Sequence, residues 1–489
     1  MVKSRKLSAS FGDEEKIVDR ISMLPDELIH DIMSFIDTKY AVQTCVLSKR
    51  WIDVWKSLPF LNFDIHGYRS IFKVKQSERV EDFINNAIIL RDNYNIQWFR
   101  LRWFYYTINN GVRKSLSRWI DVSVEHNVQE VTLELRQRSS CTYEIPPRLL
   151  NCISLKRLEL IVNKCVHINL PESMSLPQLL FMHLEGLSVY GEESTKRLLS
   201  GCPLLETLNI VDCDIIIDDK RSLSLESPSL KQFAHTNHEQ HNIYRGHHLK
   251  HKIIKLSAPN LISFTCKSFL TQDYDLQNCS GQISDANLNI LYNNEFEKKQ
   301  LSDHEKEVYV IRIMELLVAV RKVKRLELSS GFLEVLWRAA DSINCQFPWL
   351  CNLQSLRVES RFTRGSLRSI AYLLTISPNV KSIKLEPNKS YSPDVGDDWE
   401  EGFSLPGMLS HLNIVRIENV DGCDAEFKIL SFLLKNAKVL KEVALYPACS
   451  SVKSPSRLRK QFKNKLRALP RASSDIKMRW GETGSTFRI

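Results

Sequence analysis

The sequence has few of the features that mark several common classes of protein. Glycine and proline number only 16 and 17 among 489 residues, too few for a collagenous or linker-rich chain. The longest mainly apolar stretch, 308–320, contains Arg312 and Glu315, so no uninterrupted run reaches the ~18 residues expected of a membrane span. The opening residues, MVKSRKLSAS, lack the apolar core of a signal peptide. We therefore expect a protein of the cytoplasm or nucleus that does not contact membranes.

The signatures of common enzymes and metal sites are also absent. No G-x-x-x-x-G-K-[ST], G-x-G-x-x-G, H-E-x-x-H or G-x-S-x-G motif occurs, and the twelve cysteines include no C-x-x-C pair. Six of the thirteen histidines lie between 235 and 251, where His247, His248 and His251 have a spacing that a helix could turn into a metal site. Because Asn242 and Gly246 favour a loop, we interpret this segment as a polar insertion. We expect no catalytic activity, no metal and no cofactor.

The excess positive charge lies almost entirely at the C-terminus. The whole chain has a net charge of +10, and the segment 453–488 alone holds eleven basic residues against Asp475 and Glu482. Such a segment can bind nucleic acid. However, Leu458, Phe462, Leu466 and Leu469 are spaced as one stripe of a helix, and Ile476, Met478 and Trp480 alternate as in a final strand. This pattern favours a segment that caps a larger structure, with the charged side chains on its solvent-exposed side.

Residues 20–59 predict three short helices with more apolar surface than they can enclose. Pro25, Asp26 and Glu27 are typical of a helix start, and an apolar face follows up to Ile36. A second short helix begins near Ala41. Ser48 can cap a third, which carries two tryptophans at i, i+4. A small helical unit with surplus apolar surface favours docking onto another protein.

The same residues resemble an F-box. The resemblance rests on Leu24-Pro25-Asp26-Glu27-Leu28 and on the segment CVLSKRWIDVWKSLP, residues 45–59. It implies a three-helix motif that binds a Skp-type adaptor and, through it, a cullin scaffold. Carried over by position, the residues that face the adaptor or form the motif are Leu24, Pro25, Leu28, Ile32, Val46, Leu47, Ser48 and Trp51. The sequence departs from the family at Asp37-Thr38-Lys39-Tyr40, where a Pro-Thr-Lys-acid stretch is usual.

A short apolar-x-x-apolar-x-apolar pattern then recurs along the chain. It begins at Ile96, Val128, Leu155, Leu179, Leu205, Leu230, Leu261, Ile283, Val323, Leu353, Val380, Leu412 and Leu440. Most gaps lie in or just above the period of about 20–29 residues of leucine-rich repeats. Two members are weak: LKQFAH, from Leu230, ends in histidine, and ISDANL, from Ile283, has a central alanine. The pattern predicts α/β repeats, each a strand followed by a return segment, stacked as a curved solenoid. Helical returns are expected at 192–199, 305–320, 366–375 and 426–436.

The end of the chain resembles the FBD region of plant F-box proteins. The resemblance rests on Asp397-Asp398-Trp399, on LSHLNIVRIENVDG from Leu409 and on FLLKNAKVLKEVAL from Phe432. It implies architecture more than activity.

Together these features predict a plant F-box/leucine-rich-repeat protein with helices on the outer face of a curved sheet. The expected division is a disordered 1–18, an F-box at 19–65, a solenoid at 95–390, an FBD region and cap at 391–480, and a flexible tail at 481–489.

The resemblance implies a non-catalytic substrate receptor of an SCF-type ubiquitin ligase, which binds an unidentified target protein through its repeats. One alternative is a repeat scaffold that no longer binds the adaptor, motivated by the departure at Asp37 to Tyr40. Another is a nucleic-acid-binding protein driven by the basic C-terminus, although that segment has no interleaved aromatic residues, so nucleic acid is not the expected partner.

Overall fold

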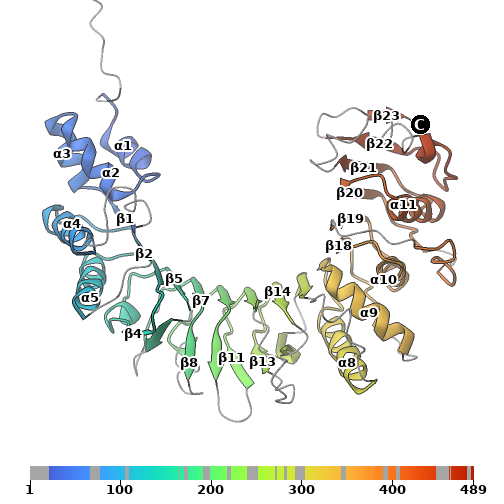
Figure 1. Ribbon diagram of the computed structural model, residues 1–489, viewed down its shortest axis with the longest axis horizontal. Coiled ribbons are helices and arrows are strands. Elements are labelled where there is room, and N and C mark those ends of the chain that lie inside the picture. Colours follow the sequence, from blue (N-terminus) through green and yellow to red (C-terminus); the bar gives the residue numbers. More distant parts are fainter. Residues whose placement is uncertain are drawn as a thin grey trace, which may run out of the picture.

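The computed structural model forms an arch of repeated strands with three helices at one end (Figure 1). The residues that it describes are 21–65 without 22, 77–104, 110–169 without 164, 174–190, 199–216, 222–238, 252–269, 272–279, 283–291, 303–342, 348–388, 395–403, 408–447, 462–481 without 463, and 486–488. Among them, no helix has the length and apolarity needed to cross a bilayer.

The N-terminal helices are α1 (Asp26–Met33), α2 (Thr38–Gln43) and α3 (Lys49–Lys56), with a 3-10 turn, η1 (Thr44–Val46), before α3. They enclose a small core of their own, separate from that of the repeats. Its centre is built from Ile29, Met33, Trp51 and Trp55. The three helices predicted from the sequence are thus confirmed.

One sixteen-stranded sheet runs through the whole arch. Its strands, in spatial order, are β1 (Phe60–Asp64), β2 (Trp98–Phe104), β3 (Glu130–Arg136), β5 (Arg157–Val162), β7 (Phe181–Glu185), β9 (Thr207–Val211), β12 (Gln232–Thr236), β14 (Ser263–Ser268), β16 (Asp285–Ile290), β17 (Arg325–Leu328), β18 (Ser355–Ser360), β19 (Ser382–Pro387), β20 (Ile414–Val420), β21 (Glu442–Pro447), β22 (Lys477–Trp480) and β23 (Thr486–Arg488). All neighbours pair in parallel except β22 and β23. Each predicted repeat forms one strand, which begins two residues after the first apolar position of its motif.

The outer face of the arch carries helices near both ends and short strands in the middle (Figure 1). The helices are α4 (Ser77–Leu90), α5 (Asn110–Glu125), α8 (Asp303–Ala319), α9 (Ser330–Ser342), α10 (Arg364–Thr375) and α11 (Asp424–Asn436). The middle strands pair as β4 (Cys141–Glu144) with β6 (Val166–Asn169), β8 (Ser188–Tyr190) with β10 (Asp214–Ile216), and β11 (Ser222–Glu226) with β13 (Lys252–Ser257) and β15 (Gln272–Asp275).

The expected helical returns at 305–320, 366–375 and 426–436 are confirmed as α8, α10 and α11. The segment expected as a helix at 192–199 lies almost entirely outside the described residues. In the middle repeats the return segments form strands, which the sequence pattern did not indicate. Their sequences explain this, because SLSLE (Ser222–Glu226) alternates polar and apolar residues with a period of two, and KIIKLS (Lys252–Ser257) contains two β-branched isoleucines.

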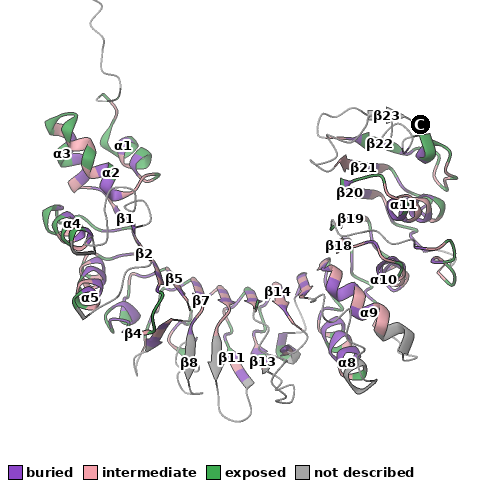
Figure 2. Cartoon of the chain, viewed as in Figure 1, coloured by how far each residue is buried: buried purple, intermediate pink, exposed green. Residues whose placement is uncertain are grey.

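Side chains on each strand of the large sheet alternate between a core and the inner surface of the arch. In β3 and β5, for example, every second residue is buried. The buried residues of all repeats join in one continuous core between the sheet and the outer layer (Figure 2). The intervening residues therefore face the concave side.

The described part of the C-terminal segment packs against the last repeat. Phe462 and Leu466 are buried, and the Phe462 ring contacts Phe427 and Trp480 with centroid distances of 6.4 and 6.1 Å. The alternating segment forms β22. Residues Thr486–Arg488 form β23, which pairs antiparallel with β22.

A test of the sheet packing uses Gly186, which adopts a positive φ of 72° in the turn after β7. A Cβ atom at this position would overlap the carbonyl oxygen of Val162 on the neighbouring strand. We expect Gly186→Ala to lower the free energy of unfolding by about 2 kcal/mol or more. Gly402→Ala is the matched control, since Gly402 also has a positive φ of 88° but has nothing within 4 Å of the added atom. Equal losses of stability, measured by chemical denaturation, would contradict the close approach.

A second test concerns Glu426, a buried residue in the first turn of α11. Its carboxylate accepts hydrogen bonds from the backbone N–H groups of Asp421, Gly422 and Cys423 at 3.1, 2.7 and 3.2 Å. Burial raises the pKa of Glu426 from 4.5 to about 7, against the opposing effect of these three donors. Between these two pH values the folded chain retains a proton that the unfolded chain has released, so rising pH favours unfolding.

We therefore expect the wild type to lose stability relative to Glu426→Gln as the pH rises from 5 to 8. Thermal unfolding of both proteins across this range measures the effect, with the exposed Glu401→Gln as the charge-matched control. A difference between wild type and Glu426→Gln that stays constant with pH would show that Glu426 does not titrate there.

Candidate protein-binding surfaces

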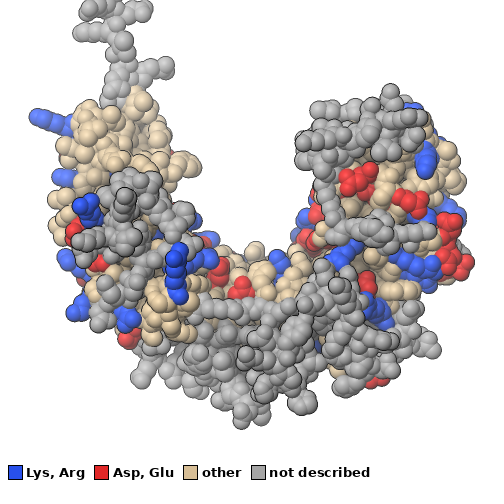
Figure 3. All heavy atoms as spheres, viewed as in Figure 1, with Lys and Arg blue, Asp and Glu red and all other residues tan. Residues whose placement is uncertain are grey.

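The three N-terminal helices expose an unusual amount of apolar surface. Of the twenty large hydrophobic side chains that are exposed among the described residues, nine lie between 21 and 52. They are Ile21, Met23, Leu28, Ile32, Phe35, Tyr40, Val46, Leu47 and Ile52, which we name the apolar patch. Figure 3 shows that the visible surface at this end of the arch is mostly uncharged. Large exposed apolar areas of this kind mark protein interfaces.

Helix α1 divides its apolar residues between two faces rather than presenting the single face that the sequence suggested. Ile29 and Met33 are buried in the helical core. Leu28 and Ile32, one turn apart, point to solvent, and Phe35 just beyond the helix is 89 % exposed. The outer residues of this helix are thus available to a partner without disturbing the core.

Val46 and Leu47 form the second part of the patch, in the turn that leads into α3. Their side chains are 84 % and 63 % exposed. The start of α3 is held against the start of α1, because the Arg50 guanidinium donates to the Leu24 carbonyl and the Asp26 carboxylate. The turn therefore lies beside the N-terminal end of α1. Ser48 stands at the N-cap position of α3, but its hydroxyl makes no capping hydrogen bond.

The structure separates the eight site residues that the resemblance implied into two groups. Exposed side chains belong to Pro25, Leu28, Ile32, Val46, Leu47 and Ser48. Leu24 is half-buried against the helical core, and Trp51 is only 7 % exposed within it. The motif comparison did not name five members of the patch: Ile21, Met23, Phe35, Tyr40 and Ile52. Their signal in the sequence was the surplus of apolar residues over what three short helices can bury.

The departure at Asp37 to Tyr40 joins the helices to the sheet. The Asp37 carboxylate accepts hydrogen bonds from the backbone N–H groups of Lys39, at 2.8 Å, and of Asp64 in β1, at 2.6 Å. The Thr38 hydroxyl accepts from the N–H of Asn62 in the same strand, at 2.8 Å. Asp37 and Thr38 thus cap α2 and fasten it to the first strand, and neither belongs to the apolar patch.

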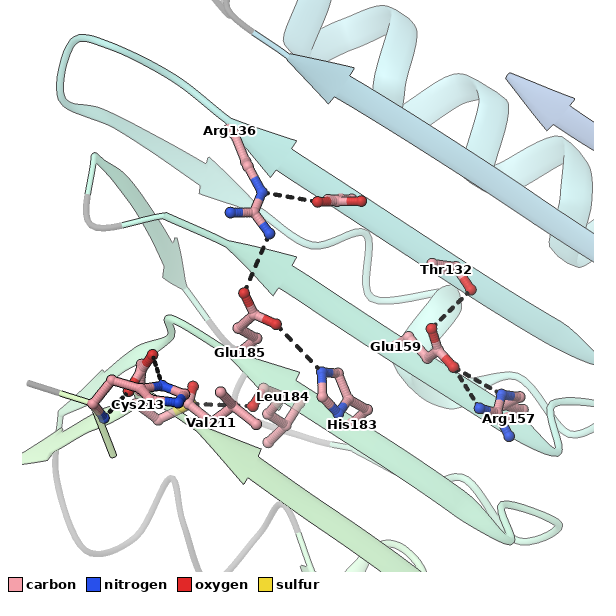
Figure 4. A network of polar contacts seen from close by, with 12 residues as sticks. Thr132, Arg136, Arg157, Glu159, His183, Leu184, Glu185, Val211 and Cys213 are labelled. Atoms are coloured by element: carbon pink, nitrogen blue, oxygen red, sulfur yellow. Dashed lines mark hydrogen bonds and ion pairs between the residues drawn. The ribbon is translucent and has the colours of Figure 1, made fainter. Parts of the chain in front are cut away.

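The concave face near the N-terminal end carries charges that pair within one strand and between strands (Figure 4). Arg136 contacts Glu134 at 2.8 Å and reaches Glu185, two strands away, at 3.2 Å. Glu185 also lies 3.7 Å from His183. Arg157 pairs with Glu159 at 2.6 Å. Because basic and acidic side chains pair here, this part of the concave face carries charges of both signs in alternation rather than a patch of one sign.

A second set of cross-strand pairs lies on β17 to β20. Arg357 contacts Glu327 at 3.1 Å and Glu386 at 2.7 Å, and Lys384 contacts Glu386 at 2.8 Å and Glu418 at 2.7 Å. Although burial raises it, Lys384 and Arg357 together hold the pKa of Glu386 below its ordinary value.

Between the two charged sets, the concave face of β9 to β16 is mostly small and polar. Its outward residues on β9 and β12 are Thr207, Asn209, Val211, Gln232, Ala234 and Thr236. A face of this composition suits a protein or peptide, which complementary charges and hydrogen bonds orient.

The histidine-rich segment offers no metal site among its described residues. The His235 imidazole is buried and hydrogen-bonded to the Tyr274 hydroxyl at 2.7 Å, and His238 lies 3.0 Å from the Asp212 carboxylate. His247, His248 and His251 lie outside the described residues. In the part of the chain that can be searched, no group of three or more His, Cys, Asp or Glu side chains is placed to hold a metal.

Three family models match consecutive parts of the sequence. An F-box domain matches residues 21–63, and an FBD model matches 404–445. Between them, a model described as "FBD-associated F-box protein At5g56370, LRR repeats" matches 116–353. The three matches fall on the N-terminal helices, on the repeats and on the segment that runs from before β20 into β21.

Similar proteins from Arabidopsis thaliana match almost from end to end. FBD-associated F-box protein At1g66310 is 27 % identical over 480 residues, which cover 97 % of this chain and 98 % of that protein. F-box/FBD/LRR-repeat protein At1g78750 is 27 % identical over 94 % of this chain and 95 % of its own length. F-box/LRR-repeat protein 13 is also 27 % identical, over 96 % and 97 %. The chain is therefore an F-box/leucine-rich-repeat protein with a C-terminal FBD region, similar along its length to these plant proteins.

Proposed function

We propose that this protein is the substrate-recognition subunit of an SCF-type ubiquitin ligase. In this role the F-box docks a Skp-type adaptor, the adaptor connects to a cullin scaffold, and the solenoid holds a target protein. F-box/leucine-rich-repeat proteins are generally substrate receptors of such ligases. The observation that carries the proposal for this chain is the apolar patch on the F-box helices.

The energetics of the apolar patch favour a permanent protein partner. Each side chain of the size of Leu, Ile or Phe gains about 1.5–3 kcal/mol when it is fully removed from water. The patch gathers nine such residues within 32 positions, whereas the other eleven exposed ones are spread over Ile89 to Val439. A partner with an apolar groove would cover Leu28, Ile32 and Phe35, with α1 as the helix that lies in the groove.

The position of the F-box in the arch supports separate binding sites for the adaptor and for the target protein. The N-terminal helices form one tip of the arch, and the concave side of the repeats opens between this tip and the C-terminal one (Figure 1). A partner on the apolar patch and a protein on the repeats can thus bind together. The receptor itself needs no catalytic group, since tethering the target near the ubiquitin-loaded enzyme raises its effective concentration. We place this activity in the cytoplasm or nucleus.

A repeat scaffold that has lost adaptor binding is the second candidate, and the departure at Asp37 to Tyr40 motivated it. Asp37 and Thr38 are hydrogen-bonded to β1 and do not contribute to the apolar patch. Tyr40, which stands where the family usually has an acid, is itself a member of the apolar patch. The departure therefore removes no apolar residue from the docking surface, which favours the receptor.

Adaptor docking is tested with the double variant Val46→Glu, Leu47→Glu. Two carboxylates in the centre of a desolvated interface would weaken adaptor binding by about 100-fold or more, measured by titration of the full chain with a purified Skp-type adaptor. The control is Leu204→Glu, Val439→Glu, which places the same charges on exposed apolar residues of the solenoid. Equal affinities of the two double variants would contradict docking through the patch.

The receptor and scaffold hypotheses differ in the fate of the bound protein. When the tagged chain is recovered from plant cells under proteasome block, we expect its associated proteins to carry ubiquitin conjugates. The Val46→Glu, Leu47→Glu variant should retain the same proteins without conjugates, because its solenoid is unchanged. Proteins that remain unmodified on the wild type would favour the scaffold.

A further inference from the structure

A row of lysines follows one edge of the sheet in the C-terminal half of the arch. Just before or at the start of each strand, one residue is joined by a backbone hydrogen bond to the corresponding residue of the neighbouring strand. In this half of the arch the residues joined in this ladder are Lys324, Gln354, Lys381, Asn413, Lys441 and Lys477. Each N–H in this series donates to the preceding member at 2.8 or 2.9 Å. Lys322 and Lys438 lie in the turns that lead into the same edge. We name Lys322, Lys324, Lys381, Lys438, Lys441 and Lys477 the lysine edge.

The ammonium groups of the lysine edge are available to a partner. All six residues are exposed. No carboxylate among the described residues forms an ion pair with any of them. The members between them are neutral amides, Gln354 and Asn413. The acid next to Lys441 in the sequence, Glu442, pairs with Arg479 at 3.6 Å.

The N-terminal half of the same edge is different. The corresponding ladder there contains Lys156 and Lys231. The Lys156 ammonium donates to the Gln129 amide oxygen at 3.0 Å, and Lys231 pairs with Glu206 at 2.6 Å. The register of the repeats is the same in both halves, so the repeat geometry alone does not explain unpaired charge in one half.

The spacing of the lysine edge suits an extended chain. Strands lie ~4.8 Å apart, so the five steps from β17 to β22 span about 24 Å, the length of roughly seven residues of extended polypeptide. Lys324, Lys381 and Lys441 recur every second strand, about 10 Å apart. Trp349 precedes β18, the strand that lies between those of Lys324 and Lys381, and it is 61 % exposed and offers an apolar anchor.

We propose that the lysine edge is a docking site for an extended acidic segment of a partner protein, with carboxylates opposite the lysines and a bulky apolar residue on Trp349. That this partner is the recruited target rests on the proposed function. Carboxylates and peptide N–H groups also match the amides of Gln354 and Asn413, which can both donate and accept. A single-stranded nucleic acid would require a series of aromatic platforms for its bases, and the ladder from Lys324 to Lys477 contains none.

The test uses the full chain and a fluorescent twelve-residue glutamate-rich peptide as the probe, in a salt series. We expect Lys381→Gln, Lys441→Gln to weaken peptide binding about tenfold at low ionic strength, and added salt to abolish the difference. The control is Lys156→Gln, Lys231→Gln, which removes the same net charge from the same edge and should bind the peptide like the wild type.

Three outcomes overturn the proposal: no binding of the peptide at low salt, equal losses in the two double variants, or tighter binding of a twelve-nucleotide DNA strand that is lost in Lys381→Gln, Lys441→Gln. Thermal unfolding checks that both variants fold. Titration with the Skp-type adaptor separates this proposal from the proposed function, since Lys381→Gln, Lys441→Gln should bind the adaptor like the wild type. A failure of adaptor binding in the wild type would count against the receptor and leave the peptide result standing.

Discussion

The backbone ladder between parallel strands is the interaction on which the rest of this structure depends. It begins at β1, directly after the F-box, and continues without a break to β22. Because every strand enters the ladder at the same position of its motif, alternate side chains of all repeats fall into one core and one concave face. The cross-strand ion pairs and the lysine edge are further consequences of this shared register.

The same ladder determines how the F-box is attached. Its small core alone could not orient three short helices, but β1 makes them continuous with the first repeat. Phe60 of β1 stacks on Trp98 of β2 with a centroid distance of 4.8 Å, and the Arg91 guanidinium donates to the Leu58 carbonyl at 2.7 Å. The Asp37 and Thr38 hydrogen bonds complete the junction. A partner on the apolar patch is therefore held in a defined orientation to the repeats.

The strands could be predicted from the sequence because each motif repeats the same physical requirement. Even the weak motifs conform: His235 takes a core position because its imidazole hydrogen-bonds to Tyr274, and Ala286 is buried although it is small. The secondary structure of the outer layer was harder to predict, since a return segment of similar length forms a helix in one repeat and a strand in another. That choice depends on the packing between neighbouring returns, which a single motif does not contain.

The binding surfaces, too, could be predicted only in part from the sequence. Motif comparison identified Leu28, Ile32, Val46 and Leu47, but periodicity alone did not reveal which apolar residues of α1 face inward and which face outward. The lysine edge was not visible in the sequence, because Lys324, Lys381 and Lys441 are distant along the chain and become neighbours only through the register. The basic C-terminal segment had drawn attention to charge, yet of that segment only Lys477 belongs to the edge.

The most direct measurement of the central claim is hydrogen–deuterium exchange of the full chain with and without a purified Skp-type adaptor. The account predicts that the adaptor slows exchange in α1 and in the turn from Thr44 to Ile52, and leaves the concave strands from β9 to β16 unchanged. Unchanged exchange in the F-box helices, or slowing centred on the concave strands, would contradict it.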